Sequence, residues 1–512
     1  MINNLGLKFI SVAKKNALKP AILFKNKSVT FKQLDNLSNK LANWVIKSKI
    51  PQYSVVCLTS EKSLFNFAMI VALIKLGVTY TIIDRKSPIK RIKKILNIIR
   101  PSAVITNRSN ERFFKNKKIN IFFEEDIKRF SKKEINLDKY IQNVPSSTLS
   151  YLMFTSGSTG FPKGVSISHS NLIYFSEWCK NEFDISAKDR VTNLNPLFFD
   201  NSVFDIYGGL FNGASIVPVS RVDTVNPSNT VKILKKKRAT TWFSVPSLIT
   251  YYQKFFLMNK KNLPSIKKII FGGEGFPKKN LKKLFESFSK KVSLFNVYGP
   301  TECTCICSSY KISQKDFTTS EMQRYAPFGT NLARNFKYLI LDNNNKLINK
   351  KGMVGELFIG GDLVGPGYYN QPRETLNKFI QCPLHSSYRD IYYKSGDLVY
   401  KDLKNNKIYF SSRKDNQIKF HGYRIELDEI ENNLSLIKGI KECAVTFGKK
   451  NSTEQITAWV VSNLGVERIL KSLSDSMPAY MLPKNIIKLK NLPKNSNGKI
   501  DRMSLKRKYY DR

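Results

Sequence analysis

Residues 151–164 read YLMFTSGSTGFPKG. The apolar start of this stretch predicts a buried strand, and the strand opens into a loop of glycines and hydroxyls that ends at Lys163. Glycine lets backbone N–H groups approach a ligand closely and adopt positive φ. These N–H groups, the hydroxyls and the charge of Lys163 together have the chemistry of a polyphosphate site. The loop is not a Walker A motif, because Pro162 stands where that motif has a glycine before its lysine.

The residues before this loop predict an α/β fold. Residues 54–59 form an apolar run typical of a buried strand, residues 64–76 have the pattern of a helix, and residues 79–83 resemble the next strand. Alternation of strands and helices favours a parallel sheet covered by helices. Residues 108–133 are polar, and we expect them to form a surface excursion.

A second, smaller module is expected near the C-terminus. The composition changes near residue 413, and about 100 residues follow, which is enough for a small domain. Within them we expect a helix over 427–436, strands over 444–447 and 455–461, and a helix near 466–473.

The bulk composition is that of a globular protein. Hydrophobic residues make up 42% and charged residues 24% of the chain, which is ordinary for such a protein. Its length of 512 residues predicts two or three domains. No apolar run approaches the roughly 20 residues that span a bilayer, and the N-terminus lacks the pattern of a signal peptide. We therefore expect a cytoplasmic protein.

The formal net charge of +46 allows two interpretations. Nucleic-acid binding is one. The other is a bias toward AT-rich codons, because the chain is rich in Lys, Asn and Ile and its lysines are spread along its whole length. We favour codon bias. A basic surface would in either case steer an acidic protein partner toward the chain.

The seven cysteines do not predict a disulfide scaffold, since their number is odd and their spacing is irregular. Cys303, Cys305 and Cys307 form a C-x-C-x-C pattern, for which a metal site is one interpretation. Structural zinc sites usually pair C-x-x-C units with further Cys or His ligands, and the chain has three histidines. Small polarizable residues that line a pocket are the favoured interpretation.

Five further motifs follow the loop in sequence. They read FGGEG at 271–275, NVYGPTE at 296–302, YKSGDL at 393–398, RKDNQIKFHGYRIELDEIE at 413–431 and NLPKNSNGKIDR at 491–502. Glycines after a strand are where α/β sheets bind ligands. Tyr298 offers an aromatic face for a base, Glu302 a hard ligand for a hard cation, and Asp397 a carboxylate that can accept two hydroxyls.

Together with the loop, these motifs resemble those of the adenylate-forming superfamily, which contains acyl-CoA synthetases, luciferases and peptide-synthetase adenylation domains. Residues 29–34 and 76–88 also resemble the early motifs of that family, so the resemblance covers roughly residues 20–505. It implies an α/β fold with a large N-terminal domain of layered parallel sheets and helices, residues 1–412. A small mobile C-terminal α+β domain, residues 413–512, would follow, with a hinge at Asp415.

The resemblance also implies roles for individual residues, with ATP and Mg²⁺ as cofactors. Catalytic roles fall to Lys499, Glu302 and Thr155. Lys499 would neutralise charge at the α-phosphate and carboxylate, and Glu302 would hold Mg²⁺. Tyr298 would stack on adenine. The nucleotide would be bound by Thr155, Ser156, Gly157, Ser158, Thr159, Gly160, Lys163, Gly273, Glu274, Asn296, Tyr298, Gly299, Thr301, Asp397 and Arg413.

The implied reaction is activation of a carboxylate as acyl-AMP with release of pyrophosphate, followed by acyl transfer to a thiol. In amino-acid-activating members the aspartate of Phe-Asp-x-Ser pairs with the substrate ammonium, and here it is Asp200. A buried carboxylate needs a cationic partner, which a fatty acid does not offer. The substrate pocket would be lined by Asp200, Asn201, Phe204, Ser244, Ile270, Gly272, Val297, Cys305 and Ile306.

Apart from Asp200 this pocket carries no charge, so it favours a small or medium neutral amino acid, and Asn201 and Ser244 could bind a hydroxyl. Two subfamilies compete: a free-standing peptide-synthetase type of adenylation enzyme and the D-alanine–carrier-protein ligases. D-alanine enzymes have a cysteine where Gly272 stands. We therefore prefer the general amino-acid enzyme.

The expected acceptor is a separate, acidic, phosphopantetheine-bearing carrier protein, because the chain ends soon after Lys499. An acyl-CoA synthetase remains an alternative, against which Asp200 argues. A nucleic-acid-binding protein on a degenerate ligase fold is an alternative of another class. Retention of the loop together with Glu302, Asp397 and Lys499 argues against it. Membrane association through the basic surface stays open.

Overall fold

The computed structural model describes residues 3–59, 61–114, 119–129, 135–157, 160–288, 291–318, 325–329, 331–332, 336–403, 405, 407–451, 453–495 and 500–510. The described chain divides into two compact units. Unit 1 comprises Met1–Ile83, Arg100–Met153 and Val165–Lys414, and unit 2 comprises Asp84–Ile99, Phe154–Gly164 and Asp415–Arg512. Unit 2 therefore contains the glycine-rich loop and one N-terminal helix as well as the C-terminal module.

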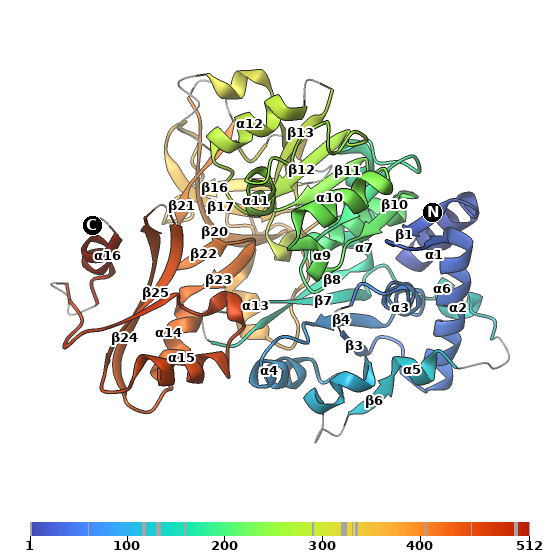
Figure 1. Cartoon of the computed structure of the whole chain (residues 1–512), viewed down its shortest axis with the longest axis horizontal. Helices are drawn as coiled ribbons and strands as arrows, with labels where there is room; N and C mark the ends of the chain where they lie inside the picture. The colour runs from blue at the N-terminus through green and yellow to red at the C-terminus, as the bar shows by residue number, and fades with distance from the viewer. Residues whose placement is uncertain are drawn as a thin grey trace. The chain divides into compact units, whose positions relative to one another are not determined.

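A seven-stranded sheet carries the glycine-rich loop (Figure 1). Among the described residues its order is β18-β8-β7-β4-β3-β5-β6. The strands are β3 (Val55–Thr59), β4 (Thr79–Ile83), β5 (Ala103–Thr106), β6 (Asn120–Phe123), β7 (Leu149–Thr155), β8 (Lys163–Ser168) and β18 (Gly367–Tyr368). The run from β7 through β4, β3 and β5 to β6 is parallel. The loop joins β7 to its neighbour β8, so its two ends are fixed by the sheet.

The predicted strands at 54–59 and 79–83 are confirmed as β3 and β4, and the predicted helix at 64–76 is confirmed as α3 (Leu64–Lys75). One expectation was wrong in part. Residues 120–123, inside the predicted surface excursion, form β6, which pairs with β5 at the edge of the sheet. An edge strand is half exposed and lacks the continuous apolar pattern of a central strand.

A nine-stranded sheet in the described residues has the order β15-β14-β13-β12-β11-β9-β10-β1-β2. Its strands are β1 (Pro20–Leu23), β2 (Ser28–Thr30), β9 (Arg190–Asn193), β10 (Ser215–Pro218), β11 (Thr241–Ser244), β12 (Lys268–Gly272), β13 (Ser293–Tyr298), β14 (Ser308–Lys311) and β15 (Asn331–Leu332). Pairing is parallel from β1 to β13. The motifs 271–275 and 296–302 begin at the carboxyl ends of neighbouring strands β12 and β13 and therefore meet at one edge.

A third sheet in unit 1 is antiparallel. It contains β16 (Lys337–Leu341), β17 (Val354–Gly360), β19 (Phe379–Gln381), β20 (Ile391–Lys401) and β21 (Ile408–Arg413). Asp397 of β20 stands opposite Arg413 of β21 in the register of the pair. Both motifs at 393–398 and 413–431 therefore start from one hairpin.

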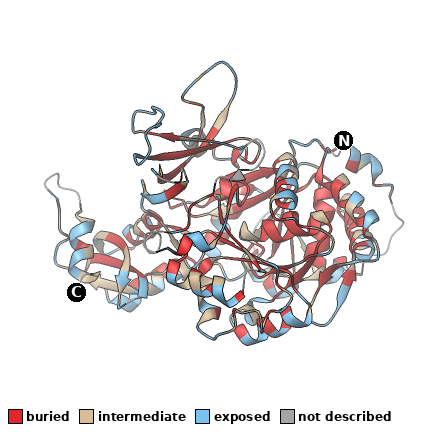
Figure 2. Cartoon of the chain, turned by 90° about the horizontal axis from the view of Figure 1, so that it is seen from above, coloured by how far each residue is buried: buried red, intermediate tan, exposed pale blue. Residues whose placement is uncertain are grey.

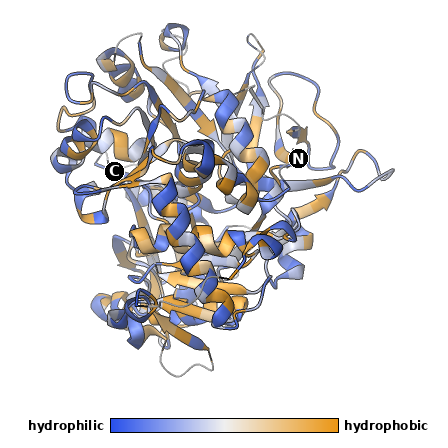
Figure 3. Cartoon of the chain, turned by 90° about the vertical axis from the view of Figure 1, so that its right-hand side faces the viewer, coloured by the Kyte–Doolittle hydropathy of each residue, from blue (hydrophilic) through white to orange (hydrophobic). Residues whose placement is uncertain are grey.

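Most helices of unit 1 bury an apolar side. The helices of this unit are α1 (Leu5–Lys15), α2 (Phe31–Lys47), α3, α5 (Glu124–Ile127), α6 (Asp138–Gln142), α7 (His169–Glu182), α8 (Asn201–Val203), α9 (Arg221–Thr224), α10 (Pro227–Lys236), α11 (Pro246–Gln253), α12 (Lys278–Phe288) and α13 (Pro372–Lys378). Strands are mostly buried while helices show mixed burial (Figure 2). Many helices show one apolar and one polar side (Figure 3). Helix α3 is almost wholly buried.

Lysine 75 at the end of α3 ties three helices together. Its ammonium, fully buried, donates to Asp35 Oδ1 at 2.5 Å and to Ser38 and Asn39, all on α2. The same ammonium lies 5.5 Å from the centroid of the Phe9 ring on α1. A buried charge is tolerated when it is paired and hydrogen-bonded, as it is here.

The C-terminal module of unit 2 has its own core. A hairpin of β22 (Gln417–Phe420) and β23 (Tyr423–Glu426) precedes a sheet of β24 (Ile440–Lys450), β25 (Thr453–Ser462) and β26 (Asn485–Lys488). Its helices are α14 (Leu427–Ser435), α15 (Val466–Ser474) and α16 (Arg502–Tyr510), while α4 (Ile89–Ile99) enters unit 2 from the N-terminal part of the chain. The helices expected at 427–436 and 466–473 are confirmed as α14 and α15.

Candidate functional site

The end of β13 presents an aromatic and acidic cluster in unit 1. The Tyr298 hydroxyl donates to Asp397 Oδ2 at 2.5 Å, and Arg413 Nη1 donates to Asp397 Oδ1 at 2.7 Å. The Tyr298 ring stacks on Phe328, with 3.9 Å between centroids and 9° between planes. Burial and the Asp397 charge raise the pKa of Tyr298 well above its usual value, so it stays a hydrogen-bond donor. Three predicted nucleotide residues thus form one hydrogen-bonded group.

Asp200 and Thr301 are brought into contact although they come from different motifs. The Thr301 hydroxyl donates to Asp200 Oδ2 at 2.5 Å. Burial and then the Asp200 charge raise the pKa of the Cys305 thiol. The residues predicted for the substrate ammonium and for the α-phosphate therefore adjoin one another.

Glu302 is fully buried and its Oε1 accepts a 2.7 Å hydrogen bond from the Tyr368 hydroxyl. Tyr368 in turn is anchored by Thr375, whose hydroxyl accepts from the Tyr368 backbone N–H at 2.9 Å. A carboxylate held inside the protein provides the hard oxygen ligand that Mg²⁺ prefers. The donor chemistry at Glu302 thus fits the divalent cation that the sequence predicted.

The predicted pocket residues are mainly buried. Phe204, Ser244, Ile270, Val297, Cys305 and Ile306 are each at most 3% exposed, and Asn201 is partly exposed. Phe204 packs against Phe243 with 4.6 Å between ring centroids. The Ser244 hydroxyl accepts from the Trp242 indole at 2.7 Å and donates to the Val245 carbonyl at 3.2 Å. The hydroxyl proton of Ser244 is therefore engaged, and binding a substrate hydroxyl would use its second lone pair as an acceptor.

Gly272 has no room for a side chain. A Cβ atom there would lie 2.3 Å from the Val297 carbonyl oxygen on the neighbouring strand. Contacts below 3.0 Å are not made by real Cβ atoms. In this backbone a cysteine at position 272, which the resemblance implies for D-alanine enzymes, would require β12 and β13 to move apart.

Residues 303–307 form a strained turn. Thr304 and Cys305 both have positive φ, 58° and 74°, which costs free energy in residues that have a Cβ. The Thr304 hydroxyl holds the turn by donating to the Leu363 carbonyl at 2.7 Å. The three cysteines of the C-x-C-x-C pattern are buried and form no disulfide, and they are not among the described groups with metal-ligand spacing. That spacing occurs instead at Cys382, His385 and Asp390, whose ligand atoms lie within 4.8 Å of one another.

The glycine-rich loop has the features of an anion site. The Thr155 hydroxyl is buried and has no hydrogen-bond partner within the described residues, so it is available to a ligand. Gly157 cannot carry a side chain, since its Cβ would lie 2.0 Å from the Phe161 carbonyl oxygen, and Gly160 has φ of +78°. Lys163 is 9% exposed. Ser158 and Thr159 lie outside the described residues.

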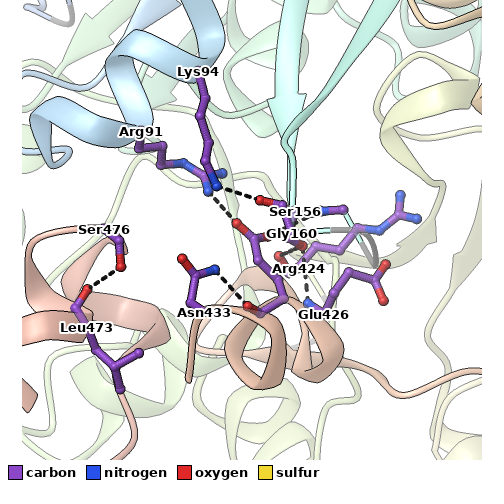
Figure 4. Close-up of polar contacts among 11 residues, drawn as sticks. Arg91, Lys94, Ser156, Gly160, Arg424, Glu426, Asn433, Leu473 and Ser476 are labelled. Atoms are coloured by element: carbon purple, nitrogen blue, oxygen red, sulfur yellow. Dashed lines mark hydrogen bonds and ion pairs between the residues drawn. The ribbon is translucent and has the colours of Figure 1, made fainter. Parts of the chain in front are cut away.

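Two of the loop's donors are engaged inside unit 2 (Figure 4). The Ser156 hydroxyl donates to the Arg424 carbonyl at 2.8 Å, and the Gly157 N–H donates to Glu429 Oε2 at 3.2 Å. In the same cluster Arg91 on α4 pairs with Glu429 on α14. The sequence predicted these loop donors for phosphate, but in this structure a backbone carbonyl and a carboxylate occupy them.

The remaining predicted residues are two polar side chains, two glycines, the expected hinge residue and the expected catalytic lysine. Asn296 donates to the Pro327 carbonyl at 2.8 Å, and Glu274 Oε1 accepts from the Ser247 N–H at 2.9 Å. Gly273 has φ of +90°, and Gly299 is packed so closely that a Cβ would lie 2.4 Å from Ile306 Cα. Asp415 accepts from the Gln417 N–H, while Lys499 lies outside the described residues.

Comparison with known proteins identifies the family. The family model of the AMP-binding enzyme matches residues 9–369, and the model of the AMP-binding enzyme C-terminal domain matches residues 429–499. The chain belongs to the AMP-binding enzyme family. It is thus one of the adenylate-forming ligases that its motifs resemble.

Two relatives and one solved structure illustrate the similarity. Bacitracin synthase 1 of Bacillus licheniformis is 32% identical over 95% of this chain, which spans 9% of that protein. The D-alanine--D-alanyl carrier protein ligase of Listeria monocytogenes serotype 4a (strain HCC23) is 31% identical over 84% of each chain. The Vibrio cholerae adenylation domain AlmE, solved in complex with glycyl-adenosine-5'-phosphate, has a TM-score of 0.85 at 22% identity and covers 99% of this chain and 98% of that chain. It supports the fold.

Sequence reasoning missed four residues around the site. Phe328 and Tyr368 lie in segments without a recognised motif, so no local signal pointed to them. Arg91 and Glu429 are 338 positions apart, and their pairing depends on the folded chain. In the described part of the chain no helix is long and apolar enough to cross a membrane.

Proposed function

We propose that this chain activates a neutral, small to medium amino acid as its aminoacyl-AMP, releasing pyrophosphate, and passes the aminoacyl group to the phosphopantetheine thiol of a separate carrier protein. The observation that carries this proposal is the contact between Asp200 and Thr301. It joins the group for the substrate ammonium to the group for the α-phosphate, so the two reacting parts would be held side by side.

Each residue of the cluster takes one task in this reaction. Asp397 and Arg413 would bind the ribose, and Tyr298 would contact the base through its ring edge or the face opposite Phe328, because Phe328 stacks on one face. Glu302 would hold Mg²⁺, which neutralises phosphate charge when bound. Thr155 would donate its hydroxyl to a phosphate oxygen, and Lys499 would stabilise charge at the α-phosphate.

The substrate class follows from the pocket. Its other lining residues, from Phe204 to Ile306, are apolar or small, so a second charge on the substrate would be buried without a partner. D-alanine is the second candidate, because a D-alanine--D-alanyl carrier protein ligase matches this chain over most of both lengths. The backbone at Gly272 favours the general amino-acid enzyme, since it leaves no room for the cysteine of D-alanine enzymes.

The division of labour along the chain is also part of the proposal. Residues 1–412 would bind the substrates, and residues 413–512 would carry Lys499 and turn about Asp415. The net charge of +46 would favour an acidic carrier protein by electrostatic steering. ATP and an intracellular carrier would place the enzyme in the cytoplasm.

The test is amino-acid-dependent exchange of pyrophosphate into ATP by the purified chain, across the proteinogenic L-amino acids, glycine, D-alanine and several fatty acids. Exchange with one neutral amino acid supports the proposal. Exchange with D-alanine alone favours the second candidate. Exchange with fatty acids alone would favour an acyl-CoA synthetase activity for this chain. No exchange with any acid, together with tight nucleic-acid binding, would overturn the proposal.

A further inference from the structure

We propose that Glu429 is a competitor of nucleotide polyphosphate for the glycine-rich loop, and that Arg91 is the positioning residue that holds it there. The inference rests on the proposed function only in taking ATP as the ligand of the loop. It adds that the loop has an internal occupant, the segment from Arg424 to Glu429, which must leave before the β- and γ-phosphates can bind.

The central contact is a carboxylate on a loop amide. Glu429 Oε2 accepts from the Gly157 N–H at 3.2 Å, and Oε1 accepts from Arg91 Nη1 at 2.8 Å. The side chains of Arg91 and Glu429 are 6% and 4% exposed, so neither charge is left to solvent. A buried ion pair is strongly unfavourable to break, and Arg91 therefore fixes the carboxylate on the loop.

Residues of the C-terminal module also bind the loop at Ser156. The Ser156 hydroxyl donates to the Arg424 carbonyl at 2.8 Å and accepts from the Glu426 N–H at 3.2 Å. On the far side of the loop, Lys94 donates to the Gly160 carbonyl at 2.9 Å and lies 4.7 Å from the centroid of the Phe161 ring. Groups from α4 and from residues 424–429 thus hold the loop from both ends.

These contacts use the donors that a phosphate group needs. A carboxylate oxygen and a phosphate oxygen are both anionic acceptors of backbone N–H groups, and one N–H cannot serve both at full strength. The Ser156 hydroxyl has one proton, which it gives to Arg424. The Thr155 hydroxyl is not engaged. In this structure the Thr155 hydroxyl can therefore still donate to a phosphate, whereas the Ser156 hydroxyl and the Gly157 N–H are already used.

The competition predicts the direction in which the affinity for ATP changes when Glu429 is altered. If the occupied loop is the dominant state of the free protein, the apparent affinity for ATP falls by the fraction of molecules in which the loop is open. Glu429→Gln removes the charge that Arg91 holds and weakens the bond to Gly157. ATP should then bind about tenfold more tightly, the effect of losing one charge-assisted hydrogen bond in the occupied state.

The experiment measures binding by calorimetry with the full chain and no carboxylic acid present. ATP and inorganic tripolyphosphate should both bind more tightly to the Glu429→Gln variant, while AMP, which lacks the β- and γ-phosphates, should bind as to the unchanged protein. The matched control is Glu431→Gln on the same helix, because Glu431 pairs with Arg502 and not with the loop. The control should leave all three affinities unchanged.

Unchanged or weaker binding of ATP and tripolyphosphate to Glu429→Gln would overturn the inference, and so would an equal gain for AMP. The double variant Arg91→Met with Glu429→Met separates the competition from a purely structural role. It removes both partners of the ion pair and leaves the net charge beside the loop unchanged, but it places no acceptor on the Gly157 N–H. A thermal midpoint near that of the unchanged protein with ATP binding still tightened supports the competition, and ATP binding equal to that of the unchanged protein would contradict it.

Hydrogen exchange provides a readout that does not depend on a variant. Added ATP should raise amide exchange in residues 424–433 of the unchanged protein, whereas AMP should not, and no rise with ATP would contradict the inference. Because these assays contain no acid substrate, a failure to activate amino acids would count against the proposed function and leave the competition intact.

Discussion

The hydroxyl of Tyr298 donates a 2.5 Å hydrogen bond to the carboxylate of Asp397, although 99 positions separate the two residues. This bond links the carboxyl end of β13 in the nine-stranded sheet to β20 in the antiparallel sheet. Because Asp397 also pairs with Arg413, the carboxylate stands between a neutral donor and a cation. The orientation of the predicted ribose-binding carboxylate is thus set before any nucleotide arrives.

Asp397→Asn should lower both stability and nucleotide affinity. The change leaves Arg413, whose side chain is 13% exposed, without its anionic partner, and breaking a buried pair in this way costs about 3–5 kcal/mol. We expect a clearly lower thermal midpoint and a raised KM for ATP in the exchange assay. Asp342→Asn serves as the control, because it lies on a partly exposed turn where an amide oxygen can keep both backbone N–H bonds of the carboxylate, and it should change neither quantity clearly. An unchanged KM for ATP would remove Asp397 from the nucleotide site.

Asp200→Asn should act on the amino acid and not on the nucleotide. If Asp200 pairs with the substrate ammonium as proposed, loss of its charge is worth about 2–5 kcal/mol, so kcat/KM for the amino acid should fall at least about 30-fold. The KM for ATP should change little. The variant should activate a related carboxylic acid that lacks the amino group as efficiently as the unchanged protein does. If both acids lose activity equally, Asp200 acts through Thr301 and not on the ammonium.

Lys75→Ala should destabilise the three-helix cluster of α1, α2 and α3. It removes the ammonium from Asp35, whose carboxylate is 21% exposed, and leaves a cavity beside Phe9. We expect a loss of about 3 kcal/mol or more in unfolding free energy, seen as a lower midpoint in thermal or urea unfolding. Lys75→Met keeps the stem and should cost less than Lys75→Ala. Equal losses would show that the charge and not the packing dominates.

His169 predicts a pH dependence of stability. Burial lowers its pKa from 6.5 to about 3, and its Nδ1 accepts a 3.2 Å hydrogen bond from the Leu5 N–H, which fixes the neutral form. Between these two pKa values the unfolded chain binds a proton that the folded chain does not. The contribution is fully present above pH 6.5 and is lost progressively as the pH falls toward 3, by at most about 5 kcal/mol.

The measurement is the thermal midpoint of the unchanged protein and of His169→Gln at several pH values from 7.5 to 4.5. The variant starts from a lower midpoint but should lose less on acidification, because it has no imidazole to protonate. Carboxylates contribute equally to both curves and cancel in their difference. Parallel curves would show that His169 does not titrate during acid unfolding.

Gly272→Ala should impair the chain through the strand pair of β12 and β13. The added Cβ would press on the Val297 carbonyl, so either the strands separate or the variant folds poorly. We expect weaker amino-acid-dependent exchange together with a lower thermal midpoint. Gly465→Ala is the matched control, since a Cβ there meets nothing within 4 Å. Full activity with D-alanine in Gly272→Ala would instead favour the D-alanine assignment.

Local pattern was enough to predict the elements whose burial is uniform. The strands β3 and β4 and helix α3 are buried along almost their whole length, so their apolar runs in the sequence agree with their bounds in the structure to within one residue. Strand β6 was missed because it is an edge strand of partly exposed residues. The motif residues that meet at Asp397 could be found one by one, but not their mutual bonds.

The contacts that were missed share a physical cause. Phe328 lies on Tyr298 and Glu429 lies on Gly157 because the fold brings distant segments together, and neither contact leaves a periodic signal in the sequence. The loop's glycines indicated an anion site. They could not show that a carboxylate of the same chain binds there.

The ammonium of Lys75 has a consequence for how the N-terminal region opens. It contacts Asp35, Ser38 and Asn39 on α2 and faces Phe9 on α1, so α2 and α3 cannot separate without unpairing a buried charge, and departure of α1 would remove the ring that covers it. Three helices that share one buried ion should therefore exchange their amide protons as a single cooperative unit, with one common opening free energy.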